Sequence, residues 1–166
     1  NHAGIGTFVS SGDDGYTGSP SYPSTSQYVI SVGGTQFDNS GSAEAWGTAN
    51  DDPALGGAQS GCSTVIAKQS WAPDDSPCGN FRADADIAAF ASPNPGVAVS
   101  VHGHWEADGG TSAAAPFSAA LFAAAGHGDA RPAFVYSHVD AFTDVAEGIT
   151  GPCGNVLCQG GVGWDG

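Results

Sequence analysis

Basic residues are almost absent from this sequence. Lys and Arg together number 3 among 166 residues, against 17 Asp and Glu, which gives a formal net charge of −14 at pH 7. Binding to a nucleic-acid backbone or to an anionic membrane surface depends on clustered Lys and Arg. The composition therefore argues against nucleic acids and membranes as partners.

Methionine is missing altogether, and no basic segment followed by an apolar run marks a signal peptide. We therefore expect a processed chain or a piece of a longer one. No apolar stretch approaches the roughly 18 residues that a membrane-spanning helix needs. Charged residues make up only 12% of the chain and hydrophobic residues 40%, a balance that predicts a folded core and not a disordered acidic tail.

The four cysteines fall into two local pairs, Cys62 with Cys78 and Cys153 with Cys158. Neither pair has the C-x-x-C spacing of a zinc site, and no histidine stands at a matching interval. Two disulfides are predicted in preference to four free thiols, and closing a loop the size of 62–78 would stabilise the fold by roughly 3 kcal/mol. Because disulfides persist in oxidising compartments, we expect a secreted, extracellular protein.

Short apolar runs bounded by turn residues predict strands, and continuous runs of this kind are typical of a parallel sheet buried on both faces. The predicted strands are residues 5–10, 28–32, 86–91 and 97–101. The second is expected to stop at Gly33-Gly34, and the Gly-, Ser-, Ala- and Asp-rich residues 40–61 to form a surface excursion. Together with a helix further along, these strands indicate an α/β architecture in one compact unit.

The segment Gly110-Thr111-Ser112-Ala113-Ala114-Ala115-Pro116 carries the chemistry. It opens a run of small residues that predicts a helix to about Ala125. A serine at the start of a helix lies among aligned N–H groups, which stabilise negative charge that develops beside it. Pro116 is expected in the first turn, where its missing N–H costs little. Taken alone, however, the segment favours a simpler interpretation, a serine N-cap before an Ala-rich core helix.

Other segments change this interpretation when they are considered together. In order along the chain they are Ser11-Gly12-Asp13-Asp14-Gly15 after a strand, residues 22–35 (YPSTSQYVISVGGT), residues 82–93 (RADADIAAFASP), the Ser112 segment and residues 142–165. The set resembles the sedolisins, the serine-carboxyl peptidases with a subtilisin-like fold, although Ser92 stands where that family often has Asp. The resemblance implies a three-layer α/β fold with a mostly parallel sheet. Residues 1–166 would form the C-terminal part of the catalytic domain.

The resemblance makes Ser112 the nucleophile and Asp13 the acid of the oxyanion hole, with Asp14 as an ordinary turn residue. An aspartate donates a hydrogen bond only in its protonated form, so this role implies work in acid. The general base of a sedolisin is a Glu oriented by an Asp four residues later. Glu44, Glu106 and Glu147 all lack that partner and are interpreted as surface acids. We expect the base in the missing N-terminal half of the domain, and little or no peptidase activity from this chain alone.

The resemblance also implies a bound Ca²⁺. Its ligands would be the carboxylates of Asp144 and Asp165 and the carbonyl oxygens of Val145, Gly161 and Gly163. Such an oxygen-only ligand set suits calcium, and the pattern of an EF-hand loop is absent. The Cys153–Cys158 bridge would then staple the same loop.

The leading hypothesis is a secreted serine-type endopeptidase of acidic environments, which hydrolyses protein or peptide substrates through an acyl-enzyme. Two alternatives stay open. One is a subtilisin-like serine peptidase fragment, although that family would be expected to have Asn where Asp13 stands. The other is a non-catalytic secreted calcium-binding module derived from a peptidase.

Overall fold

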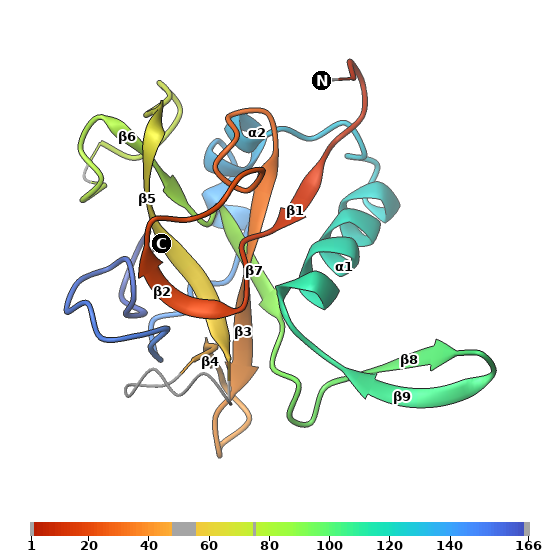
Figure 1. The fold of residues 1–166 in the computed structure, drawn as a ribbon. Helices are drawn as coiled ribbons and strands as arrows, with labels where there is room; N and C mark the ends of the chain where they lie inside the picture. The colour runs from red at the N-terminus through yellow and green to blue at the C-terminus, as the bar shows by residue number, and fades with distance from the viewer. Residues whose placement is uncertain (1, 48–55, 75, 165–166) are drawn as a thin grey trace.

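A computed structural model describes residues 2–47, 56–74 and 76–164. Its elements are, in chain order, β1 (Phe8–Ser10), β2 (Asp14–Gly18), β3 (Ile30–Phe37), β4 (Ala43–Ala45), β5 (Gly57–Ala67), β6 (Phe81–Asp84), β7 (Ile87–Phe90), β8 (Val97–Val101), β9 (His104–Asp108), α1 (Thr111–Ala124), α2 (Pro132–Tyr136) and the 3₁₀ helix η1 (Val139–Ala141) (Figure 1). Neither α-helix of the described residues has the length and apolarity that a bilayer crossing requires.

The central sheet is parallel in its middle. β3 lies between β1 and β7 and runs parallel to both, with Phe8 opposite Ile30 and Val32 opposite Ile87. The short strand β4 pairs antiparallel with the far end of β3. Three of the predicted strands therefore form a parallel core as expected, while the sheet as a whole is mixed.

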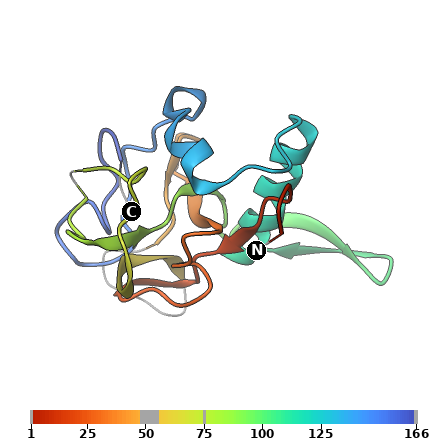
Figure 2. The same cartoon turned by 90° about the horizontal axis from the view of Figure 1, so that it is seen from above.

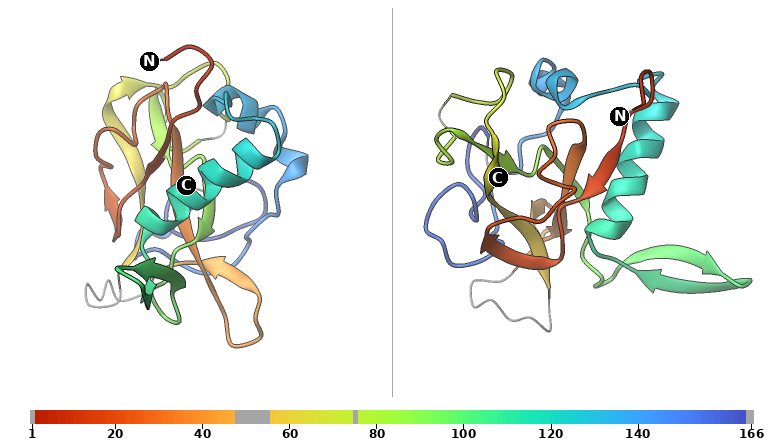
Figure 3. Two further views of the ribbon diagram at one scale, coloured as in Figure 1. Left: turned by 90° about the vertical axis from the view of Figure 1, so that its right-hand side faces the viewer. Right: turned by 45° about the horizontal axis from the view of Figure 1, so that its top comes forward.

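Helix α1 packs against β1, β3 and β7, and lies across one face of the sheet (Figure 3). Ile30 and Val32 of β3 are fully buried, and Ala114 and Ala115 of α1 belong to the same core cluster. Alanines on the inner side of a helix let it lie close to a sheet, because their side chains end at Cβ. Phe8 packs edge-on against the ring of Phe122, with ring centroids 5.0 Å apart. These contacts hold α1 against the sheet both near its start, at Ala114, and near its end, at Phe122.

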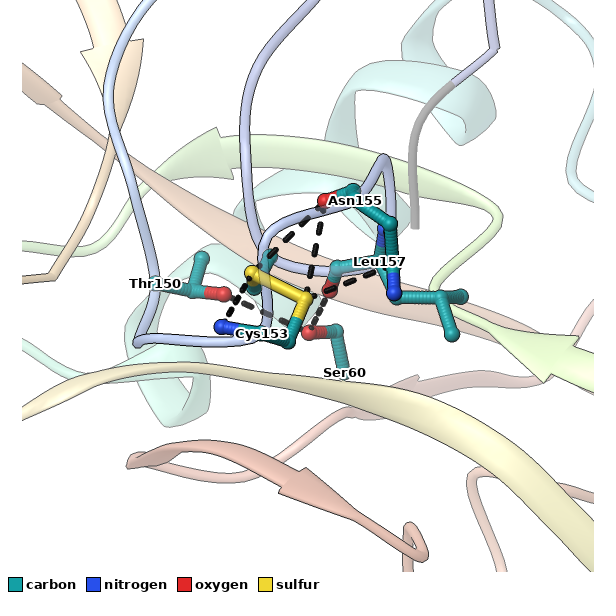
Figure 4. Close-up of a disulfide and its surroundings, with 6 residues drawn as sticks. Ser60, Thr150, Cys153, Asn155 and Leu157 are labelled. Atoms are coloured by element: carbon teal, nitrogen blue, oxygen red, sulfur yellow. Dashed lines mark hydrogen bonds between the residues drawn. A yellow bond between two sulfur atoms is a disulfide. The ribbon is translucent and has the colours of Figure 1, made fainter. Parts of the chain in front are cut away.

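A second sheet, with β5 as its middle strand, has both predicted disulfides nearby. β5 pairs parallel with β2 and antiparallel with β6. The Cys62–Cys78 bridge joins β5 to the loop before β6, and Cys153–Cys158 closes a loop near the C-terminus. Figure 4 shows how this second loop is tied to β5: the Ser60 hydroxyl donates to the Leu157 carbonyl and lies 3.3 Å from the Thr150 hydroxyl. Both predicted pairings are confirmed.

The expectation that a strand stops at Gly33-Gly34 is wrong. β3 runs through both glycines to Phe37, because their missing side chains allow close packing and do not mark a turn. A Cβ on Gly34 would lie 2.7 Å from the Cβ of Ala91 and 2.9 Å from the Trp46 ring. Neither distance is tolerated by real Cβ atoms, so only glycine fits.

The predicted surface excursion at 40–61 is also wrong in part. Residues 43–45 form β4, and residues 57–61 are a buried stretch of β5. Small residues here again allow close approach of neighbouring backbone and are not a sign of exposure. Residues 48–55 of this range lie outside the described residues.

The strand at 97–101 forms as predicted but does not join the parallel sheet. β8 pairs antiparallel with β9, with Val97 opposite Asp108 and Val101 opposite His104. Seen from above, this hairpin projects from the body of the molecule (Figure 2). All residues of β9 are exposed, so the apolar run of β8 is not a mark of burial on both faces.

Candidate active site

The first turn of α1 presents Ser112 to solvent. Gly110 is the N-cap residue, with φ +83°, and Ser112 is the second residue of the helix. The Ser112 side chain is exposed, and its hydroxyl has no hydrogen-bond partner among the described residues. The simpler interpretation of Ser112 as the helix N-cap is therefore wrong.

Pro116 is the sixth residue of α1 and not a first-turn residue, which corrects the sequence prediction. At this position an N–H would donate to the carbonyl four residues earlier, which belongs to Ser112. Because proline has no N–H, the Ser112 carbonyl lacks its helical partner. The helix is therefore weakened next to the residue that presents the hydroxyl.

Asp13 caps α1 from a distant part of the chain. It follows β1 in sequence, and its Oδ1 accepts hydrogen bonds from the backbone N–H of Thr111 at 2.7 Å and from the Thr111 hydroxyl at 2.8 Å. This contact gives an acceptor to one of the N–H groups that the first turn of a helix leaves unpaired. A side chain 98 residues away in sequence thus lies one residue from Ser112.

One N–H group of this turn remains without an acceptor. The Gly110 N–H donates to the Ala91 carbonyl, the Thr111 N–H donates to Asp13, and the Ala113 N–H donates to the Gly110 carbonyl. Among the described residues the Ser112 N–H has no partner. A donor of this kind beside an exposed serine hydroxyl can bind an oxyanion.

Gly110 makes room for the Asp13 carboxyl. A Cβ built on Gly110 would lie 2.5 Å from Asp13 Oδ2, and a positive φ already favours glycine. The two residues therefore fit together only without a side chain at 110.

The three glutamates of the chain lie outside the first turn of α1, on three separate segments. Glu106 lies on the exposed strand β9 opposite Val99, and Glu147 is exposed near the C-terminus. Glu44 is half-buried on β4, not in a loop, and accepts a hydrogen bond from the Gln36 amide at 2.9 Å. None of the three is hydrogen-bonded to Ser112 in the described part of the chain.

Comparisons with known proteins give one consistent answer. The chain is 30% identical over 184 residues to kumamolisin of Bacillus sp. (strain MN-32), a match that covers 98% of this chain and 33% of kumamolisin. The structure matches that of Pseudomonas sedolisin, a serine-carboxyl proteinase complexed with two molecules of pseudo-iodotyrostatin. The TM-score is 0.77 and the identity 30%, over 98% of this chain and 51% of that chain. The chain is related to the sedolisins.

The sedolisin relationship covers this chain almost completely but its relatives only in part. The chain spans about half of the matched sedolisin structure and a third of kumamolisin. No family model matches the sequence. What the comparisons show is a relationship to the sedolisins and an α/β structure like that of sedolisin. The roles of single residues are taken up as proposals below.

The calcium ligands that the sedolisin resemblance implies lie in the C-terminal segment, and those described beside a cavity there are Asp144, Val145 and Gly163. The exposed Asp144 accepts a hydrogen bond from the Gly163 N–H at its Oδ2, at 3.0 Å, so two of the expected ligand residues are neighbours. Asp165 lies outside the described residues. The part of the chain that the structure describes contains no cluster of three or more His, Cys, Asp or Glu side chains that could hold a metal.

A cavity of about 710 Å³ separates this C-terminal segment from the sheet. Its wall includes Gly34, Ala88, Tyr136, Asp144, Gly163 and Trp164. Neither Ser112 nor Asp13 contributes to it. This partly open cavity therefore lies beside the expected metal loop and not at the candidate active site.

A buried charged cluster was missed at the sequence level. Arg82 is fully buried and forms a two-pronged pair with Asp86, at 2.9 and 2.6 Å. Tyr136 donates to Asp86 Oδ1 at 2.9 Å. Asp84, also fully buried, accepts from the Ser24 hydroxyl at 2.7 Å. The alternation Arg-Ala-Asp-Ala-Asp was a possible signal, because it puts three charges on one side of a strand.

Proposed function

We propose that this chain is the nucleophile-bearing part of a serine-type endopeptidase that hydrolyses proteins or peptides in acid. The observation that carries the proposal is the Asp13 carboxyl at the start of α1, one residue from Ser112. A subtilisin-type site would be expected to hold Asn there. An aspartic acid takes over the role of that amide when it is protonated, because only then does it have an O–H to donate.

The reaction is acyl transfer. The Ser112 hydroxyl oxygen attacks the peptide carbonyl carbon, and its proton passes to a carboxylate base. As the carbon becomes tetrahedral, its oxygen gains negative charge. That oxygen accepts hydrogen bonds from the Ser112 N–H and from protonated Asp13. The carbon–nitrogen bond then breaks as the base returns the proton to the leaving amine, and water hydrolyses the acyl-enzyme.

A carboxylate is a suitable base for this chemistry in acid, where a histidine would already be protonated. The described residues bring no glutamate to Ser112, so we assign the base to a Glu–Asp pair outside these 166 residues. The same outside segment would complete the three layers of a subtilisin-like domain. The chain alone is then expected to have little or no activity.

The test compares peptide hydrolysis by the full-length protein at pH 4 and pH 8. Activity is expected at pH 4, and Ser112→Ala should lower kcat by several orders of magnitude. Ser100→Ala, which changes an exposed serine of β8, is the matched control and should remain active. Activity confined to pH 8 would favour a subtilisin-like site. A protein that neither turns over peptides nor is labelled at Ser112 by a fluorophosphonate would be a non-catalytic module. Turnover by the isolated chain would contradict the assignment of the base.

We also propose a structural Ca²⁺ at the C-terminal loop, held by the carboxylates of Asp144 and Asp165 and the carbonyls of Val145, Gly161 and Gly163. The proximity of Asp144 to Gly163 supports this, and so does the purely oxygen donor set. The ion would stabilise the loop by joining its oxygen ligands, and it would take no part in the reaction at Ser112. Removal of calcium with EDTA should lower the melting temperature, and added Ca²⁺ should restore it. A melting temperature that EDTA does not change would contradict the site.

We also propose that the protein is secreted, because two disulfides are typical of an oxidising compartment.

A further inference from the structure

Thr111 makes three hydrogen bonds at the candidate active site. Its backbone N–H and its hydroxyl both donate to Asp13 Oδ1, at 2.7 and 2.8 Å. The same hydroxyl oxygen accepts the Gly12 N–H at 3.1 Å. Thr111 is fully buried whereas Asp13 is exposed, so these bonds are shielded from water on the Thr111 side only.

The direction of these bonds is fixed by the donor at Gly12. A backbone N–H can only donate, so the Thr111 hydroxyl must accept there, and its own proton is left for Asp13. Oδ1 therefore receives two donated hydrogens. An oxygen in that position cannot itself carry a proton toward Thr111.

The consequence concerns the other oxygen of Asp13. A carboxylic acid has a single O–H, and with Oδ1 occupied as an acceptor the proton must be on Oδ2. Among the described residues Oδ2 has no hydrogen-bond partner, and it lies against the backbone of Gly110, where a Cβ would come within 2.5 Å. Protonated Asp13 therefore has an O–H at Oδ2 that none of the described residues accepts, and it contacts the same helix turn that contains the unpaired Ser112 N–H.

We propose that Thr111 is a positioning residue that holds Asp13 by Oδ1 and so directs the Oδ2 proton toward the substrate oxyanion. The catalytic part of this inference rests on the proposed peptidase function. The hydrogen bonds of Thr111 are observed whether or not that function holds. Thr111 also links the turn after β1 to α1, because Gly12 and Asp13 both bond to it. These bonds thereby fix the position of the Asp13 carboxyl relative to the first turn of α1, which contains the Ser112 N–H.

Three variants test the role of the hydroxyl. Thr111→Val keeps the shape and removes the hydroxyl, Thr111→Ser keeps the hydroxyl, and Thr150→Val removes another buried threonine hydroxyl, one near Ser60. In the full-length protein at acidic pH, Thr111→Val should lower kcat about 10- to 100-fold. That is less than the roughly 10²- to 10³-fold loss when a whole oxyanion donor is removed. KM should stay within about twofold, because the lost alignment matters only in the transition state.

The serine variant should recover most of kcat, and Thr150→Val should lower the melting temperature without lowering kcat. An unchanged kcat in Thr111→Val, or a loss that serine does not rescue, would overturn the proposal. A second measurement does not need activity: amide hydrogen exchange at Gly12 should accelerate in Thr111→Val but not in Thr111→Ser. If the wild type is inactive while this exchange pattern holds, the peptidase function fails and Thr111 still holds the Asp13 turn. If the Gly12 exchange rate does not change, the positioning role fails.

Discussion

At the scale of single residues, the fully buried Asp84 makes stability depend on pH. Burial raises the pKa of Asp84 to about 6, against the hydroxyls of Ser31 and Ser24, which lower it. A carboxyl whose folded pKa lies above its unfolded value of 3.8 gives its full stabilisation below the unfolded pKa. That contribution is lost as pH rises through the folded pKa. The protein should lose roughly 3 kcal/mol between about pH 4 and pH 7 from this group alone.

The amide Asp84→Asn isolates this contribution. Asparagine keeps an acceptor for Ser24 and stays neutral, so the variant should equal the wild type near pH 4 and exceed its stability at pH 7. Urea unfolding at the two pH values measures the difference. Asp129→Asn, at an exposed carboxyl, controls for the change in net charge and should leave the pH profile unaltered. If the difference in the free energy of unfolding between Asp84→Asn and the wild type is the same at both pH values, the assignment is contradicted.

At the scale of elements, the two disulfides should stabilise unequally. Cys62–Cys78 closes a loop with a sequence separation of 16, and Cys153–Cys158 one with a separation of 5. In the chain-entropy model a longer loop loses more freedom, so removal should lower the free energy of unfolding by about 3 kcal/mol for the first bridge and about 2 for the second. Denaturation of the two paired Cys→Ala variants checks the order. A larger loss from the shorter bridge would show that packing around Cys158 outweighs loop entropy.

Prediction from the sequence succeeded for local features and failed where distant segments meet. The runs at β1, β3 and β7 are apolar enough to mark a buried parallel sheet, and the disulfides follow from spacing. The prediction that the strand stops at Gly33-Gly34 is wrong. In sequence, a glycine that ends a strand looks the same as one that leaves room for a neighbouring side chain such as Trp46. The bond between Thr111 and Asp13 spans 98 residues, and no local pattern encodes it. Resemblance to a family selected Ser112 and Asp13, but only the fold shows what holds them.

At the scale of the whole molecule, net charge and an uncovered helix face act together. Helix α1 has no charged residue, and Phe117 and Leu121 on its outer side are 62% and 58% exposed. A helix that is apolar on all sides is normally covered, and none of the described residues covers these two. At pH 7 a net charge of −14 opposes contact between copies. Near the pI of about 4.1 that repulsion vanishes.

The isolated chain should therefore be monomeric at pH 7 and associate near pH 4 through the outer side of α1. Sedimentation velocity at both pH values and equal ionic strength measures this. Phe117→Ser with Leu121→Ser should stay monomeric at pH 4, whereas Val65→Ser, at an 81% exposed residue of β5, should associate like the wild type. If the double variant still associates at pH 4, the surface through which the copies bind does not include Phe117 and Leu121. Because the site is proposed to work in acid, the pH at which it would act is also the pH at which the repulsion between copies of the chain is weakest.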